Sequence, residues 1–301
     1  MVRANLRATV VGFAAAAVVF AVLFTLVGVD DLVATLRAAE TGAVALVVVA
    51  TVAWLLAWAV SLYTVLGVLG VDLSYPSSFL LFSGATFANN VTPFGQAGGE
   101  PITAYLISRV TDAEYERGLA AIASVDTLNF VPSITIALLG AGYFATEVAL
   151  GANRSVLVAV GGVVGLAVVV PSLVYLGWRR RYGLEARIVD GLTPVIRVLA
   201  RRLPRVPVPT PEGIENRIDG FFRAIERVAA NPRQLAVALA ASTAGWLCQT
   251  LALRVAFEAI GVSVPLSVVF VVVPIGAIAG VTPLPGGAGG IETVLVLLLL
   301  A

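Results

Sequence analysis

The sequence predicts an all-α polytopic membrane protein with about six transmembrane helices and two re-entrant broken-helix hairpins in an inverted repeat. Three observations predict this fold class. Of the 301 residues, 59% are hydrophobic and 12% charged, and the mean hydropathy is +0.99. Long uncharged runs recur along the chain, and two Gly- and Pro-rich segments share one pattern. Because a soluble domain carries about a quarter charged residues, the composition excludes that class.

The scarcity of reactive side chains limits the chemistry that the chain can perform. The sequence contains no His and one Cys, Cys248. A disulfide framework, the usual zinc sites and Ser-His catalysis are therefore excluded. We expect no metal and no cofactor.

Uncharged runs predict the transmembrane helices, because a helix that crosses about 30 Å of hydrocarbon needs roughly 20 apolar residues. A sixth apolar segment begins near Ile291 and stops at Ala301. It is too short to cross, so either the sequence is shortened or the last helix only enters the bilayer. The first run has no cleavage site after it and is interpreted as a retained anchor. The runs of full length are Thr9–Val29, Val44–Leu69, Leu119–Phe144, Ser155–Trp178 and Leu235–Ile260.

The distribution of arginine predicts the orientation of these helices. The stretch Arg179–Arg233 holds twelve Arg and six acids, whereas the loop Asp30–Glu40 holds three acids and one Arg. Cytoplasmic loops carry the excess of basic residues. We therefore expect a multi-pass protein of the cell membrane, with the N-terminus and residues 179–233 in the cytoplasm.

The chain divides into a first membrane half (1–178), a basic insert (179–233) and a second membrane half (234–301). Apolar residues in the insert recur at helical spacing on both sides of a Pro-rich break at 204–211. Two interpretations stay open: basic amphipathic helices on the anionic inner leaflet, or a helical hairpin packed on itself. Since membrane topology explains the charge, we expect no binding to nucleic acid.

Landmarks in the two halves repeat at a nearly constant offset. Gly70 and Gly261 are 191 residues apart (261 − 70), and the Val-Thr-Pro triplets at 91 and 281 are 190 apart (281 − 91). The Ala-Gly-Gly triplets at 97 and 288 are again 191 apart (288 − 97). This pattern indicates an internal duplication.

Each copy contains a short apolar segment, then Pro and Gly, then another helix-forming segment, at about 74–108 and 263–290. Pro and Gly interrupt helices, and the freed backbone groups are tolerated only inside protein or beside water. A re-entrant hairpin lining a cavity is predicted in each copy. If both hairpins turn back, the copies are inverted, as in many transporters.

Polar residues gather where the predicted helices break. Glu100 opens the helix after the first break, and Glu292 holds the comparable place in the second copy. Each has two interpretations, a cap at a helix N-terminus or a functional charge at membrane depth. The candidate translocation residues at the two breaks are Asn89, Asn90, Thr92, Gln96, Gly98, Gly99, Glu100, Gly286, Gly287 and Glu292.

Three further features add charged or polar groups near membrane depth. Asp126 and Asn129, three residues apart, share a helix face that we expect to turn inward, for an interhelical hydrogen bond or a substrate role. Arg109 either binds a lipid phosphate or extends to the cytoplasmic surface. Arg254 and Glu258 lie four apart and are expected to neutralise one another.

The two breaks, Pro93–Pro101 (PFGQAGGEP) and Pro283–Glu292 (PLPGGAGGIE), resemble the signature loops of one family. It is the lysylphosphatidylglycerol synthase transmembrane-region family, also called flippase-like integral membrane proteins. In its full synthases this region is associated with moving the modified lipid across the bilayer. No part of the sequence resembles the soluble synthase domain, so the resemblance implies the translocating half alone. It also implies that Gln96, Gly98, Gly99, Glu100, Gly286, Gly287 and Glu292 share the role of the family loops.

Our leading hypothesis is a flippase-like protein that translocates an anionic lipid or lipid-linked head group between leaflets. One alternative is a membrane enzyme, or the partner of a separate synthase or glycosyltransferase, acting on a polyprenyl-phosphate or phospholipid carrier. Such chemistry usually needs clustered carboxylates or a tuned general base, and the sequence has no Asp-x-Asp and no His. The other alternative is an ion-coupled small-solute transporter.

Overall fold

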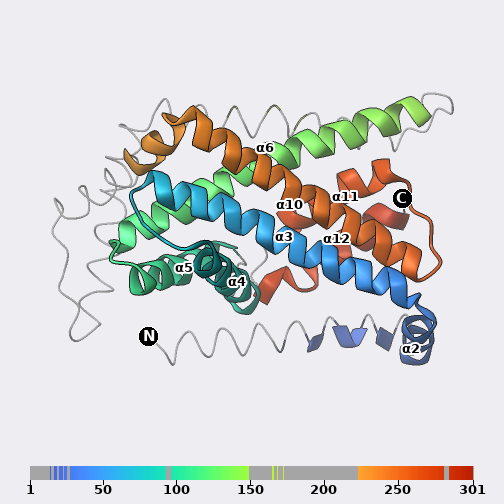
Figure 1. Cartoon of the computed structure of the whole chain (residues 1–301). Helices are drawn as coiled ribbons and strands as arrows, with labels where there is room; N and C mark the ends of the chain where they lie inside the picture. Colours follow the sequence, from blue (N-terminus) through green and yellow to red (C-terminus); the bar gives the residue numbers. More distant parts are fainter. Residues whose placement is uncertain are drawn as a thin grey trace, which may run out of the picture.

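The computed structural model describes residues 28–92, 96–148, 223–280 and 285–300, with single positions among 14–25 and at 165, 168 and 172. Within these residues every regular element is helical, as the all-α prediction requires. Apart from the helix at 29–38, which buries no residue, the elements pack into one helical bundle (Figure 1).

Three helices are long and apolar enough to cross a membrane. They are α3 (Thr41–Val68), the Tyr115–Tyr143 part of α6 (Tyr115–Val148) and α10 (Pro232–Ala259). They correspond to the second, third and fifth runs predicted from the sequence, with ends that differ by a few residues. About half of the predicted span Thr9–Val29 and nearly all of Ser155–Trp178 lie outside the described residues.

The centre of the bundle is an antiparallel pair, α3 and α10, which lie side by side (Figure 1). At one end of the pair the Glu40 amide donates to the Ala259 carbonyl at 2.9 Å, which places the start of α3 against the end of α10. Within the pair, a Cβ at Gly245 would lie 2.0 Å from the indole nitrogen of Trp58. The glycine therefore makes room for a tryptophan between the two helices, and α6 packs across both.

Two helical hairpins complete the fold. The first is α4 (Tyr75–Val91) with α5 (Gln96–Val110). The second is α11 (Leu266–Ala279), the 3₁₀ turn η1 (Pro285–Gly287) and α12 (Gly290–Leu300). These helices have 17, 15, 14 and 11 residues, fewer than the roughly 20 that a perpendicular crossing needs. In the first hairpin, α4 ends at Val91 and α5 begins at Gln96. In the second, η1 separates α11 from α12. Each helix therefore ends where the sequence predicts a break.

The two halves of the chain share element boundaries as well as sequence landmarks. Both α3 and α10 have 28 residues, and they begin (232 − 41) and end (259 − 68) 191 residues apart. The starts of α4 and α11 are again 191 apart (266 − 75). The short helix α2 (Val29–Ala38) precedes α3, and residues 223–229 form a helix before α10.

The ends of α3 and α10 are built in the same way. Gly70 and Gly261 have φ angles of 75° and 78°, the left-handed conformation that glycine adopts at helix ends. The next residues, Val71 and Val262, donate to the carbonyls of Leu66 and Phe257, each at 2.9 Å. The duplication is therefore visible in the backbone as well as in the sequence.

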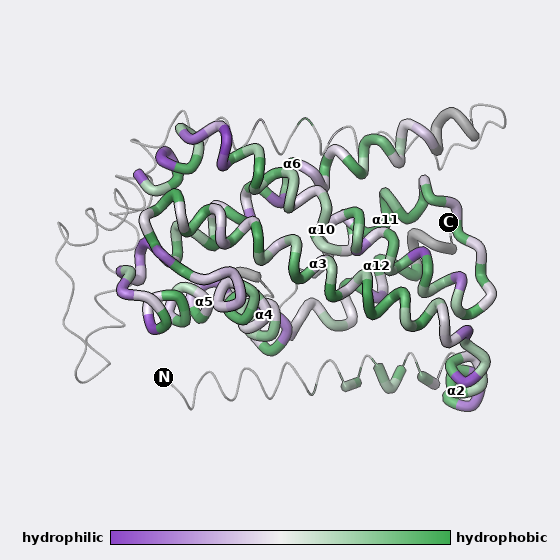
Figure 2. The backbone as a smooth tube through the Cα atoms, in the orientation of Figure 1, coloured by the Kyte–Doolittle hydropathy of each residue, from purple (hydrophilic) through white to green (hydrophobic). Residues whose placement is uncertain are grey.

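Hydropathy varies along the long axis of the bundle. Apolar residues cover α3 and α10, while hydrophilic residues lie on α2, on the α5–α6 connection and on 223–233 (Figure 2). The helix α3 carries no charge, and its side chains Val48 and Val49 are 58% and 62% exposed. Such an exposed apolar belt is typical of a lipid-facing surface.

The end of the basic insert packs on the protein. Ala224 and Val228, in the helical segment 223–229, are buried in the main hydrophobic core. The insert before residue 223 lies outside the described residues, so its two interpretations remain predictions, as do the domain limits.

Candidate functional site

A cavity of about 350 Å³ lies where both hairpins meet the long helices. Its walls come from α3, α4, α6, α10 and the second hairpin, including the start of α12. Its lining combines tryptophans and phenylalanines with amides, hydroxyls and one carboxyl group. The residues that carry the argument below are Trp54, Trp58, Asn89, Asn90, Asp126, Asn129, Trp246, Gln249, Ala277 and Gly286.

The two hairpins meet at the edge of this cavity, where α4 contacts η1. Gly286 has a φ of 62°, and a Cβ on it would lie 2.9 Å from Asn90 Oδ1. Gly287, at φ 72°, packs against Gly280, whose Cα would lie 2.5 Å from an added Cβ. Both glycines are therefore required by their backbone conformation and by close contact. The breaks, which lie far apart in the sequence, form one junction.

The first hairpin is closed by an equally tight contact. A Cβ on Gly99 would lie 1.8 Å from Asn89 Oδ1 and 2.8 Å from the Asn89 backbone nitrogen. Only glycine lets α5 approach the end of α4 so closely. Thr92 ends α4, its hydroxyl donating to the Ala88 carbonyl at 2.7 Å. Gln96 and Gly98 lie in the first turn of α5, and the side chain of Gln96 is outside the described part of the chain.

Two carboxyl groups from different helices meet beside the cavity. Glu100 on α5 and Asp126 on α6 share a side-chain hydrogen bond. Asp126 lines the cavity, and Glu100 is not among its lining residues. The pair links the first hairpin to α6. A hydrogen bond between two carboxyl groups requires a proton on one of them.

Asn129 is fixed in the cavity wall by α10. Its Oδ1 accepts from the Ser242 hydroxyl at 2.6 Å, and its backbone carbonyl accepts from Trp246 Nε1 at 2.9 Å. Trp58 Nε1 donates to the Ser242 carbonyl at 3.2 Å. Asp126 and Asn129 both face the cavity, as their spacing predicts, and Asn129 makes the interhelical bond that was one of its two interpretations.

Three buried polar atoms around the cavity have no hydrogen-bond partner among the described residues. They are Trp54 Nε1, Asn89 Oδ1 and Asn129 Nδ2. The first and third are donors and the second is an acceptor. Buried polar atoms are normally paired. Each of these three has less than 1 Å² of accessible surface, so they lie within the packed wall of the cavity.

Aromatic rings form one wall of the cavity, and the sequence analysis did not assign them to the site. The ring centroids of Trp58 lie 5.6 Å from Trp54, 5.6 Å from Trp246 and 5.9 Å from Phe82, in edge-to-face geometry. Tryptophan in membrane helices is typical of the membrane–water interface. The signal that could have identified the wall is the i, i+4 spacing of Trp54 and Trp58, which places both rings on one face.

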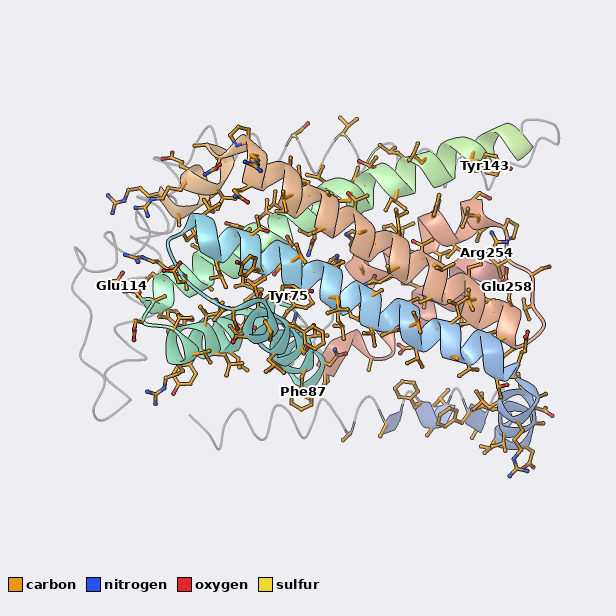
Figure 3. All side chains as sticks on the ribbon, in the orientation of Figure 1. Tyr75, Phe87, Glu114, Tyr143, Arg254 and Glu258 are labelled. Atoms are coloured by element: carbon orange, nitrogen blue, oxygen red, sulfur yellow. The ribbon has the colours of Figure 1, made fainter. Side chains whose placement is uncertain are left out.

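The remaining candidates lie away from the cavity or serve as caps. Arg109 is exposed, and its Nε donates to Tyr105 Oη at 2.9 Å. Glu292 accepts from the Gly289 amide at 2.6 Å, so it caps α12. Arg254 and Glu258 form an exposed ion pair of 2.9 Å near the end of α10, confirming the predicted neutralisation (Figure 3).

The electrostatic character of the cavity follows from its lining. Its described residues include one carboxyl group and no basic side chain. Within the described part of the chain, no cluster of three or more Asp, Glu or Cys is placed to hold a metal ion. The arrangement can therefore present neutral donors, acceptors, aromatic faces and an acid to a bound group.

Comparison with known proteins gives a family and relatives named as membrane proteins. Residues 9–301 match the profile described as "Lysylphosphatidylglycerol synthase TM region". Two relatives are each named "UPF0104 membrane protein" and come from Methanothermobacter thermautotrophicus. One is 28% identical, with 98% of this chain and 84% of the relative aligned. The other is 24% identical over 69% of this chain and 60% of the relative. No solved structure matches.

Proposed function

Because this chain belongs to the lysylphosphatidylglycerol synthase transmembrane-region family of multi-pass membrane proteins, we propose that it translocates an anionic lipid or lipid-linked head group between leaflets. The observation that carries the proposal is the cavity to which both broken hairpins contribute. A head group enters the cavity while its acyl chains stay in lipid.

The arrangement of the helices supports a re-entrant, inverted architecture. Each hairpin helix is shorter than a crossing requires, and the tips of the hairpins meet at Asn90 and Gly286. The equal-length helices that precede them, α3 and α10, run antiparallel. Two hairpins that follow antiparallel helices enter the bilayer from opposite sides, as in transporters that build a central site from discontinuous helices.

The acid pair gives the proposed carrier a switchable contact between moving parts. Glu100 is on the first hairpin and Asp126 is on a long helix. Loss of the shared proton leaves two negative charges side by side, which repel one another. We propose that the pair binds a proton or a cationic part of the head group during translocation.

A vesicle assay tests the proposed function. Purified protein is reconstituted into phosphatidylglycerol-containing vesicles, and the translocation of fluorescent phosphatidylglycerol is followed by chemical quenching of the outer leaflet. Ala277 lines the cavity from α11, so Ala277→Phe narrows it. Val49→Phe adds bulk on the exposed face of α3 and is the matched control. We expect translocation by the wild type and by Val49→Phe, and at least a tenfold lower rate for Ala277→Phe.

Three results would contradict the proposal. If phosphatidylglycerol and other lipids cross the bilayer at the same rates in protein-free and protein-containing vesicles, the protein does not translocate lipid. Uptake of soluble solutes without lipid movement would instead favour the small-solute transporter. Head-group transfer catalysed by the purified protein would favour the enzyme.

A further inference from the structure

The short helix α2 buries no side chain in the protein. It has 10 residues, and Val29, Val33 and Leu36 are exposed although they are apolar. A helix of this length is marginal in water by itself, because most helical stability comes from packing an apolar face. The apolar residues of α2 therefore need a contact that the described part of the protein does not supply.

The apolar side chains of α2 share one face of the helix. Their spacing is i, i+3, i+4 and i+7, and they are Val29, Leu32, Val33 and Leu36. The charged residues Asp30, Asp31 and Arg37 fall on the rest of the circumference. The acids lie in the first turn and the arginine in the last, which suits the helix dipole. The helix is therefore amphipathic, with a narrow apolar face and a broad polar one.

Sharp turns at both ends of α2 hold it across the bundle. Gly28, just before the helix, has a φ of 88°, and Ala39 and Glu40, just after it, are extended. The bond from the Glu40 amide to the Ala259 carbonyl ties this connection to the end of α10. In Figure 1, α2 is seen end-on and α3 from the side. Because α3 is long enough to cross a membrane, a helix that lies across its start runs along the membrane plane.

Two neighbouring features place α2 at the boundary between apolar and charged surface. The exposed ion pair of Arg254 and Glu258 lies near the end of α10 to which the α2–α3 connection is bonded. Val44, in the first turn of α3, is already exposed and apolar, and it begins the belt that includes Val48. At this level the apolar face of α2 can enter lipid while its charged face stays in water.

We propose that α2 is an interfacial helix whose apolar face binds the lipid surface at the end of the bundle where α3 begins. The predicted orientation makes this surface the outer leaflet. Helices that bind anionic head groups carry basic polar faces, whereas α2 carries two acids and one arginine. The contact is therefore made with the apolar part of the leaflet and does not depend on the charge of the head groups.

Spin labels on single cysteines measure which face of α2 enters lipid. The full chain with Cys248→Ser is placed in phosphatidylcholine nanodiscs, and collisions with oxygen, which concentrates in lipid, and with a water-soluble nickel chelate are compared. Labels at Val33→Cys and Leu36→Cys report the apolar face, and labels at Ala34→Cys and Ala38→Cys, equally exposed, are the matched controls. We expect an oxygen-to-nickel ratio at least about threefold higher on the apolar face.

Two further measurements test the stated chemistry. Leu36→Glu places a charge on the apolar face and is expected to lower the ratio at the Val33 label to that of the controls. Ala34→Glu places the same charge on the polar face and should leave the ratio unchanged. Nanodiscs rich in phosphatidylglycerol, and high salt, should also leave it unchanged, because apolar area drives the contact.

Three outcomes would overturn the inference. Equal nickel collisions on both faces would place α2 in water. Shielding of the apolar face from both reagents would mean that protein covers it. A ratio that changes with phosphatidylglycerol or salt would mean that charge drives the contact. The inference holds whether or not the protein translocates lipid, so its failure and that of the proposed function are distinguishable.

Discussion

At the scale of single residues, the candidate site depends on glycines that allow close approach and on polar residues that line the cavity. Gly99 and Gly286 bring backbone next to Asn89 and Asn90, the residues at the end of α4. The first contact closes the α4–α5 hairpin, and the second holds the two hairpins against each other. The same asparagines face the cavity, so the packing of the hairpin tips and the proposed binding of a ligand depend on neighbouring atoms.

Gly99→Ala is expected to destabilise the protein by about 1–3 kcal/mol, the usual cost of overpacking. The added Cβ would meet Asn89 Oδ1 at 1.8 Å and the Asn89 backbone nitrogen at 2.8 Å. Gly142→Ala is the matched control, because a Cβ at that position on α6 has no atom within 4 Å. Thermal unfolding in detergent measures both. Equal stability of the two variants would contradict the tight contact between α4 and α5.

Glu100→Gln tests the acid pair. Glutamine donates to the Asp126 carboxylate at every pH, whereas the native pair needs a bound proton to keep its hydrogen bond. Translocation by the wild type is therefore expected to vary with pH, and the variant is expected to lose either translocation or this dependence. The vesicle assay at several pH values measures it. Unchanged translocation at every pH would remove Glu100 from the mechanism.

At the scale of elements, the two halves repeat a long helix, a glycine-capped end and a helical hairpin. Gly70 and Gly261 have left-handed conformations, and added Cβ atoms would meet nothing within 4 Å at either site. Alanine at either position therefore tests backbone conformation without a steric clash.

Gly70→Ala and Gly261→Ala are each expected to lower the free energy of unfolding by about 1–2 kcal/mol, the cost of a left-handed conformation in a residue with a Cβ. Thermal unfolding of the two variants and the wild type provides the comparison. If one variant is destabilised and the other matches the wild type, the two helix ends are not energetic equivalents.

The sequence was sufficient to predict the long helices and the position of both breaks, for local reasons. Val44–Leu69 is uncharged over the length of a crossing, and Pro and Gly, which disfavour helix, cluster in the sequence at 93–99 and 283–290. The partners across the bundle were not predictable, because they depend on how helices pack. No local pattern joins Glu100 to Asp126, and none indicates that Trp246 meets Trp58.

The two glutamates that follow the breaks show the same limit of prediction from local sequence. Glu100 and Glu292 had identical alternatives in the sequence. Glu292 accepts from the Gly289 amide and caps its helix, whereas Glu100 bonds across to α6. The difference comes from the neighbouring helix, because α6 packs on α5, the helix that carries Glu100. The two acids therefore differ in their tertiary contacts, which local sequence does not reveal.

At the scale of the whole molecule, the protein is a multi-pass membrane protein in which described residues of both halves line the cavity. The antiparallel pair α3 and α10 forms the frame, and the hairpins supply the parts that meet at the cavity. In the proposed function, the frame positions the site and rearrangement of the hairpins opens it to either leaflet.

Cysteine accessibility tests the predicted orientation. In a Cys248→Ser background, Asp31→Cys, which lies on α2, is expected to react with a membrane-impermeant maleimide added to intact cells. Glu212→Cys, in the basic insert, is expected to react only after the membrane is opened. Arginine excess on the cytoplasmic side is the physical reason. The opposite labelling pattern would reverse the orientation, and labelling of both would refute it.

The central claim is that two broken hairpins meet around a cavity that takes a lipid head group. An experimentally determined density map of the protein in lipid nanodiscs containing phosphatidylglycerol tests it most directly. The account predicts head-group density in the cavity that Asn90, Asp126 and Gly286 line, with acyl chains continuing into the surrounding lipid. A cavity closed by side-chain packing, or hairpins that each cross the bilayer without a break, would contradict it.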